Sequence, residues 1–210
     1  MKNLIPVYYL PAFVFLFIGC NNGPADPVKT AKKENAAMID SQIKKEQPID
    51  SMALQLSQND ADFLVNAASG GMMEVQLGKL AQSNSRNQRV KNFGSMMIKD
   101  HGDANARLKE LAASRNITLP DSISNRQQKE KEKLQEKRGD AFDEAYINMM
   151  VDDHRKDIRE FEKQASRGAN EAVKAFARNY LPTLRLHLDS AEKIQKTVST
   201  PIPVDPIPGP

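Results

Sequence analysis

The sequence is poor in the residue types that carry much of enzyme chemistry. Its 210 residues include one cysteine, three histidines and no tryptophan. A single cysteine excludes an internal disulfide framework and a zinc site built from thiolates, because each needs at least two sulfur atoms. No G-x-G-x-x-G, G-x-x-x-x-G-K-[ST] or G-x-S-x-G motif occurs. Dinucleotide-binding, P-loop and serine-hydrolase functions therefore have no support.

The chain also lacks a strong excess of either charge. It has 30 Lys plus Arg against 27 Asp plus Glu, a formal net charge of +3. This excess is too small to make nucleic acid the expected partner, so we predict none. The apolar fraction of 40% is enough for one modest core.

The N-terminus has the pattern of a secretory signal peptide. An apolar run of about 15 residues follows Lys2 and ends before Gly19, after which the sequence turns polar. The run is shorter than the roughly 20 residues that span a bilayer as a helix. We therefore predict a cleaved signal peptide over residues 1–19.

The residues that end this run, Phe17-Ile18-Gly19-Cys20, resemble a bacterial lipobox. In a lipobox the cysteine thiol is alkylated by a diacylglycerol, so the resemblance predicts lipidation at Cys20 and a membrane anchor outside the cytoplasm. Asn21 stands where an inner-membrane retention signal would have Asp. This favours a lipid-anchored protein of the cell envelope, on the outer membrane and facing the periplasm. An ordinary signal peptide with an incidental cysteine is the alternative.

Two segments outside the periodic region lack the pattern of a core. Residues 20–57 are polar and interrupted by prolines, which is typical of a flexible tether. Residues 200–210 carry a proline at nearly every second position, which predicts a disordered, polyproline-like tail.

Between these segments, over residues 58–199, the apolar residues recur at intervals of three and four, the period of an amphipathic helix. The predicted helices cover approximately residues 60–83, 87–115, 140–167 and 170–197. Four such stripes bury one another most simply as a four-helix bundle, so the fold class is all-α.

The connection between the second and third predicted helices is long. Antiparallel neighbours are normally joined by two to eight residues, whereas this connection has about 24. It can span the height of the bundle, so that these two helices run parallel as in ferritin-like folds. Its segment Arg126–Arg138 is nearly all Lys, Glu, Gln and Arg, with Leu134 as its only apolar residue, which predicts a short surface helix rather than core. A fifth helix that caps one end of the bundle is the alternative.

All three histidines lie within apolar stripes, on three different helices, and Glu74 lies in the stripe of the fourth. Burying an unpaired carboxylate costs several kcal/mol, so Glu74 needs a partner inside the bundle. Counting about 1.5 Å of rise per residue from the turns pairs Glu74 with His187 and His101 with His154. The two pairs would differ in height by about two helical turns at most.

An internal repeat supports this arrangement. The pattern around Met97, Asp100 and His101 recurs 53 residues later around Met150, Asp153 and His154. In each copy the Asp precedes the His, where it could orient the ring from a position beside the ligands. Each Met lies one helical turn before its His on the same face, and a thioether beside an imidazole would favour copper.

Six motifs carry a resemblance to a known family and together span about residues 59–195. They are Asp62-Phe63-Leu64, Gly70-Gly71-x2-Glu74, Met97-Ile98-Lys99-Asp100-His101, Ala141-Phe142-Asp143-x2-Tyr146, Asp153-His154 and Leu181-Pro182-x-Leu184-x2-His187-Leu188. With these motifs the chain resembles a bacterial envelope family of unknown function, DUF4142, whose members are labelled outer membrane proteins and grouped with the ferritin-like superfamily. The resemblance implies no settled activity. The chain lacks the two Glu-x-x-His pairs of di-iron bundles, so ferroxidase or oxygenase chemistry is not expected.

Three interpretations of the polar residues remain open. They could form a buried hydrogen-bond network that fixes helix packing. They could bind a transition metal such as Cu, Zn or Fe through Glu74, His101, His154 and His187, in storage, sequestration or a structural role rather than catalysis. The bundle could instead be an interaction module that binds another envelope protein through Arg126–Arg138 or the proline tail. The sequence names no substrate.

Overall fold

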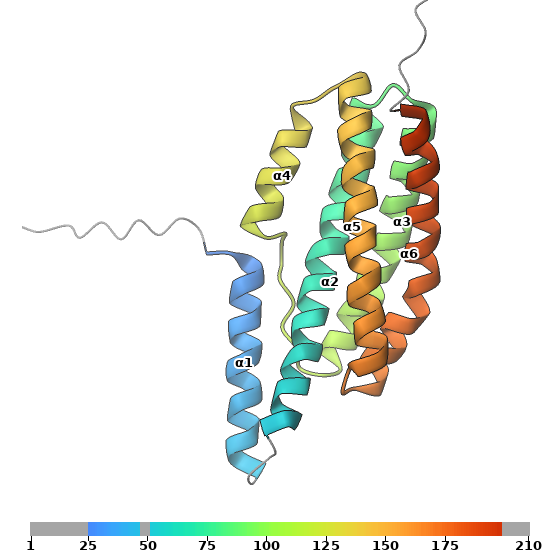
Figure 1. Cartoon of the computed structure of the whole chain (residues 1–210). Helices are drawn as coiled ribbons and strands as arrows, with labels where there is room; N and C mark the ends of the chain where they lie inside the picture. The colour runs from blue at the N-terminus through green and yellow to red at the C-terminus, as the bar shows by residue number, and fades with distance from the viewer. Residues whose placement is uncertain (1–24, 47–50, 199–210) are drawn as a thin grey trace, which may run out of the picture.

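The computed structural model describes residues 25–46 and 51–198 as an all-helical bundle (Figure 1). The helices are α1 (Pro27–Glu46), α2 (Ser51–Asn84), α3 (Gln88–Ala113), α4 (Asn125–Gln135), α5 (Gly139–Arg167) and α6 (Glu171–Val198). The predicted all-α fold is confirmed, with α2, α3, α5 and α6 as the four long helices of the bundle. No helix of the described part is long and apolar enough to cross a bilayer.

The direction of each long helix follows from the connections. Short turns join α2 to α3 and α5 to α6, so each of these pairs is antiparallel (Figure 1). The long connection climbs back along the bundle through residues 114–124 and α4, and α5 then begins beside the start of α3. Helices α3 and α5 therefore run parallel, as the length of this connection predicts. They lie diagonally opposite, because each contacts α2 and α6.

Side-chain caps define several of these helix ends. Asn87 accepts a hydrogen bond from the backbone of Arg89 at the start of α3, and Ser124 forms a capping box with Gln127 at the start of α4. The carboxylate of Asp60, which is 5% exposed, accepts hydrogen bonds from the backbone of Ala169 and Asn170. Asp60, which lies in the N-terminal part of α2, thus fixes the turn between α5 and α6.

The predicted flexible tether over residues 20–57 is wrong over two stretches, because α1 forms at Pro27–Glu46 and α2 already begins at Ser51. Helix α1 packs against α2. Its buried stripe consists of Ala31, Asn35 and Ile39, at intervals of four. The side chain of Asn35 makes two hydrogen bonds to the backbone of Thr118, at 2.9 and 2.8 Å. Two small or medium apolar residues and a buried amide give a weak hydrophobic period, which explains why the sequence pattern did not reveal this helix.

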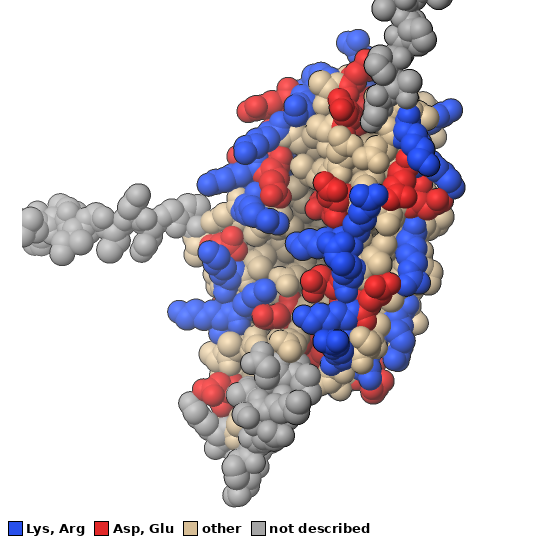
Figure 2. Space-filling view, in the orientation of Figure 1, with Lys and Arg blue, Asp and Glu red and all other residues tan. Residues whose placement is uncertain are grey.

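Helix α4 is charged, as predicted, but it is not wholly excluded from the core. Leu134 is 2% exposed and packs with the residues around Phe142. Charges of both signs occur over the face shown in Figure 2. The predicted signal peptide, Cys20 and the tail over residues 200–210 lie outside the described residues.

Candidate functional site

A polar layer divides the interior of the bundle into two apolar cores. The core nearest the turn between α2 and α3 includes Leu77, Phe93 and Tyr146. The core at the other end includes Leu108 and Phe161. On its own helix, each histidine lies between the residues of the two cores. The histidines therefore form one central polar layer.

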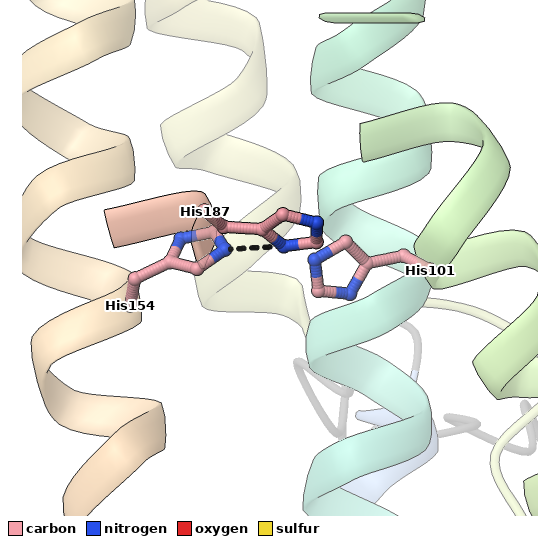
Figure 3. A group of neighbouring side chains, drawn as sticks. All are labelled: His101, His154 and His187. Atoms are coloured by element: carbon pink, nitrogen blue, oxygen red, sulfur yellow. Dashed lines mark hydrogen bonds between the residues drawn. The ribbon is translucent and has the colours of Figure 1, made fainter. Parts of the chain in front are cut away.

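The three imidazole rings form a compact triangle (Figure 3). The ring centroids of His101 and His154 are 5.6 Å apart, and each is 5.2 Å from the centroid of His187. One nitrogen from each ring can be chosen so that all three lie within 4.8 Å of one another. His154 and His187 are 0% exposed and His101 is 3% exposed. Three helices thus deliver three imidazoles to one buried point.

The outer nitrogen of each ring faces an oxygen acceptor. His187 Nε2 lies 3.0 Å from Asp100 Oδ2, and His154 Nδ1 lies 2.9 Å from the backbone oxygen of Met150. His101 Nδ1 lies 2.7 Å from Glu74 Oε2, although this pair is not aligned as a hydrogen bond. Acceptors of this kind orient histidine ligands in metal sites by fixing the tautomer.

The inner nitrogens face one another. His154 Nε2 and His187 Nδ1 are 3.2 Å apart, and His101 Nε2 has no hydrogen-bond partner among the described residues. Two ligand nitrogens of a tetrahedral zinc site are separated by about 3.3 Å, given Zn–N bonds of about 2.0–2.1 Å. The separation of His154 and His187 therefore suits two ligands of one metal ion.

Counting protons shows that this chain of contacts is incomplete as a hydrogen-bond network. Three contacts run from Met150 through His154 and His187 to Asp100. A neutral imidazole carries one N–H, so two rings supply two protons for three contacts. If His154 donates to Met150 and His187 donates to Asp100, the lone pairs of His154 Nε2 and His187 Nδ1 face each other with no proton between them. A cation between them satisfies both lone pairs.

Burial keeps these rings neutral. It lowers the pKa of His101 and of His187 to about 4, with Asp100 opposing the effect in both cases. Burial also lowers the pKa of His154, against the opposing charge of Glu74. Neutral imidazole is the form that binds metal ions.

Glu74 is the carboxylate of this layer. It is 2% exposed, Oε1 lies 3.5 Å from His154 Nδ1, and neither oxygen accepts an aligned hydrogen bond among the described residues. Burial raises the pKa of Glu74 to about 7, with His154 lowering it and Asp153 raising it further. An orphaned buried carboxylate beside three neutral imidazoles fits a site that receives a cation.

The predicted height pairing is wrong, because Glu74 contacts His101 and His154 rather than His187, and all four residues share one layer. Glu74 and His187 lie 10 and 11 residues from the α2 and α6 ends at the top of Figure 1, whereas His101 and His154 lie 13 and 15 residues from the α3 and α5 starts there. Side chains lean toward the N-terminus of their own helix. Those of α2 and α6 therefore lean down and those of α3 and α5 lean up, which closes a gap of several ångströms.

The two Asp-His pairs of the repeat differ in their surroundings. Asp100 faces α6 and binds His187, as expected of a carboxylate that orients a ligand. Asp153 lines a cavity and interacts electrostatically with Glu74 and with Glu130 of α4. Burial, together with Glu130, raises the pKa of Asp153 to about 6.

Both repeat methionines are 0% exposed and belong to the core nearest the turn between α2 and α3, together with Tyr146. Met97 and Met150 therefore have the environment of ordinary core residues. Met150 contacts the His154 ring nitrogen through its backbone oxygen, not through its sulfur.

Two site residues were not predicted from the sequence. The ring of Tyr180 lies edge-on to His101 with centroids 5.8 Å apart, and its hydroxyl donates to the backbone oxygen of Asp100 at 3.2 Å. Asp157 follows Asp153 by one helical turn, and burial, with Glu74 and Asp153 adding to it, raises its pKa well above the usual value. The interval of four on α5 is the signal that could have identified Asp157.

A cavity of about 460 Å³ between α2 and α5 reaches this layer. Glu74, His101 and Tyr180 line it near the histidines, and Asp153 and Asp157 line it along α5. Residues of α3, α4 and α6 complete its lining, among them Leu108, Glu130 and Phe176. The buried layer is thus connected to a space between the helices.

The fold and the site together define an all-helical bundle protein with a buried three-histidine cluster. The sequence matches DUF4142, a domain of unknown function, over residues 45–194, and the chain belongs to this family. No curated protein matches it. A crystal structure described as a secreted DUF305 protein from Streptomyces coelicolor is similar, with a TM-score of 0.58 and 12% identity, over 67% of this chain and 92% of that chain. At this identity the likeness concerns the fold alone.

Proposed function

We propose that this chain binds one transition-metal ion in the central layer, through His101 Nε2, His154 Nε2 and His187 Nδ1. The observation that carries the proposal is the proton count of the chain from Met150 to Asp100, because two neutral rings supply two N–H groups for three contacts. Each outer nitrogen faces an acceptor, so each inner lone pair is available to a cation.

The donor set favours a borderline metal. Imidazole suits Zn, Cu, Fe and Ni, and three imidazoles with one free position make a known arrangement for zinc. The sequence predicted Glu74 as a ligand, but its oxygens lie beside the outer nitrogens of His101 and His154, where Glu74 can act as the acceptor for His101. The ligand atoms that lie within 4.8 Å of one another belong to the three histidines. The sulfur ligands that would have singled out copper are placed in the apolar core, so we propose zinc, copper or iron without a thioether contribution.

The role that we favour for this ion is storage, sequestration or a structural one rather than catalysis. Nothing in the layer resembles an activated nucleophile. On this proposal the chain is anchored in the cell envelope by lipidated Cys20 and faces the periplasm from the outer membrane. The lipobox-like residues before Cys20 support this placement, and the similar fold belongs to a protein described as secreted. Replacing Cys20 by Ala should release the protein from membranes, and unchanged membrane association would contradict the anchor.

One observation favours a second function, a purely structural polar network. The contacts from Met150 to Asp100 form an almost continuous chain of hydrogen bonds across α5, α6 and α3. Such a chain would fix the packing of the bundle without a metal. The charged α4 would then be the surface for an envelope protein partner, and a pull-down that loses its partner when the charges of residues 126–138 are neutralised would support that role.

Calorimetric titration of the full chain with Zn²⁺, Cu²⁺, Fe²⁺ and Ni²⁺ distinguishes the two functions. Wild type should bind about one equivalent, and His101→Ala should bind far more weakly. The matched control is Asp189→Asn, which removes an exposed carboxylate of α6 that pairs with Lys193. If wild type takes up none of the four ions, the metal proposal is wrong. Lower stability of His101→Leu and His154→Leu would then support the structural network, whereas normal folding of both would show that the polar cluster is dispensable for packing.

A further inference from the structure

We propose that the cavity between α2 and α5 is the passage through which a divalent cation enters and leaves the histidine cluster while the bundle stays folded. The inference rests on the proposed function and deepens it, because it makes the site exchangeable rather than structural. It specifies the cargo as a bare or partly hydrated divalent ion that is carried from carboxylate to carboxylate.

The lining of the cavity traces a continuous path to the site. On α2 it runs from Asn59 to Glu74, which corresponds to about 22 Å of helix rise. On α5 it runs from Gln164 to Asp153, immediately before His154. The path therefore begins near the start of α2 and ends at the buried layer.

The path offers oxygen ligands at successive positions. Asp157 and Asp153 lie one helical turn apart on α5, and both line the cavity together with Glu74. Glu74 is almost fully buried and its oxygens have no aligned hydrogen-bond partner, so an ion that passes the two aspartates meets an unsatisfied carboxylate. Carboxylates can replace the waters that an ion sheds as it enters. Lys156 also lines the cavity. Its positive charge weakens the binding of a cation to the two aspartates, so the ion is not held there.

Gly70 keeps the passage wide. A glycine inside a helix costs about 1 kcal/mol relative to alanine, so its presence needs a reason. Gly71 and Gly78 have one, because a Cβ there would meet Asn105 and the backbone of Gly94 on α3. A Cβ at Gly70 would meet no atom within 4 Å, yet Gly70 lines the cavity one turn before Glu74. Close helix packing therefore does not explain Gly70, whereas an open passage does.

Protein side chains pack against the cluster on three other sides. The apolar core nearest the α2–α3 turn lies on one side of the layer and the second apolar core on the other. Tyr180 packs edge-on against His101 and donates to the backbone of Asp100, which covers the layer between α3 and α6. An ion that reaches the inner nitrogens through the cavity does not have to open these contacts.

A plug variant tests the passage. Gly70→Leu places a side chain in the cavity, and its control is Gly102→Leu, which places the same side chain on the exposed face of α3 where a Cβ also meets no atom within 4 Å. Stopped-flow mixing of the full chain with Zn²⁺, and of the loaded chain with a chelating dye, gives the two rate constants. For Gly70→Leu we expect both to fall by about tenfold or more while their ratio changes less than about threefold, since a plug raises the barrier alone.

The outcomes separate the passage from the site. Equal rates for Gly70→Leu and wild type overturn the passage and leave metal binding intact, and so does release from wild type at the rate of global unfolding. Failure of wild type to bind Zn²⁺ or any of the other three ions overturns the proposed function and the passage with it. Should Gly70→Leu fail to fold, the nearly isosteric Asp157→Asn decides, because it should slow both steps by about threefold or more. Unchanged rates in Asp157→Asn would then exclude the passage.

Discussion

Helices α3 and α5 carry the same local sequence but use it differently. In both, a core methionine precedes an Asp-His pair by three residues, and both histidines reach the central triangle. Asp100, however, binds His187, whereas Asp153 lines the cavity beside Glu74. Other positions differ as well, since Gly94 of α3 corresponds to Ile147 of α5.

The difference arises from the helices that face each copy. Asp100 of α3 meets α6, which carries His187 in the polar layer, and Asp153 of α5 lies toward α2, which carries Glu74 there. The same carboxylate therefore finds a hydrogen-bond donor in one place and a like charge in the other. A local repeat determines which residues point inward, and the neighbouring helix determines their chemistry.

The largest expected effect comes from the histidine that each copy of the repeat contributes to the triangle. His101→Ala and His154→Ala should each weaken metal binding by more than about 100-fold, or about 3 kcal/mol, because each removes one of three imidazole ligands. Competition titration with a chelating dye measures the affinities. If one of the two variants binds like wild type, only one copy of the repeat supplies a ligand.

Asp100→Asn and Asp153→Asn should separate the two copies. Loss of the acceptor that orients His187 should weaken metal affinity by about 10- to 100-fold, as is typical of such partners. Among the described residues, Asp153 forms no hydrogen bond or ion pair with a ligand nitrogen. Its replacement should therefore change the equilibrium affinity for the metal by less than about threefold. Equal losses in the same titration would show that the copies have equivalent roles.

The packing of α3 against α2 should depend on Gly94. A Cβ at this position would lie 2.8 Å from Ala81 Cβ and 2.9 Å from the backbone oxygen of Gly78. Gly94→Ala should therefore lower the free energy of unfolding by about 1–2 kcal/mol through overpacking. Urea denaturation followed by circular dichroism measures it, with Gly102→Ala as the unstrained control, and an equal or greater stability of Gly94→Ala would contradict the close approach.

The smallest expected effect is an opposite pH dependence of stability in the two aspartate variants without metal. Burial alone would raise the pKa of Asp100, but the hydrogen bonds from His187 and Lys99 outweigh it and lower that pKa. Asp100 thus stabilises the folded state above its ordinary pKa of 3.8, and this stabilisation disappears as the pH falls. Burial raises the pKa of Asp153 to about 6, so the folded state loses stability as the pH rises from about 4 past 6.

At pH 7.5 Asp100→Asn should therefore be less stable than wild type and Asp153→Asn more stable, each by on the order of 1 kcal/mol because water at these partly exposed groups screens the interactions. The Asp153→Asn difference should shrink as the pH falls from about 6 to 4, whereas the Asp100→Asn difference should shrink only as the pH falls below about 3.8. Urea denaturation in the presence of a chelator at several pH values provides the test. Shifts of the same sign in the two variants would show that the two carboxylates have similar environments.

Most of the fold could be predicted because the periodicity of long amphipathic helices is strong. The stripes that contain Phe93, Phe142 and Leu184 lie on helices in the structure. The long connection between the second and third predicted helices indicated that these two helices could run parallel, as α3 and α5 do. Helix α1 was missed, because its buried face holds only Ala31, Asn35 and Ile39 and its stability depends on contacts with α2 and Thr118.

The candidate site was predicted in its members and not in its contacts. The three histidines and Glu74 were identified as inward-facing because each interrupts an apolar stripe, which is a property of one helix. The partners of Glu74 depend on the lean of side chains from antiparallel helices, and the role of Asp153 depends on α2 and α4. No local pattern encodes either.

The amino-acid sequence by itself therefore determined that the chain forms an all-α bundle and which four polar side chains enter its interior, since helical periodicity depends on residues a few positions apart. Only the tertiary structure decided that these side chains meet in one layer, that one aspartate orients a histidine while its counterpart lines a cavity, and that this cavity reaches the layer. These features depend on distances between segments far apart in the chain, which are set by packing and by the connections rather than by any local preference.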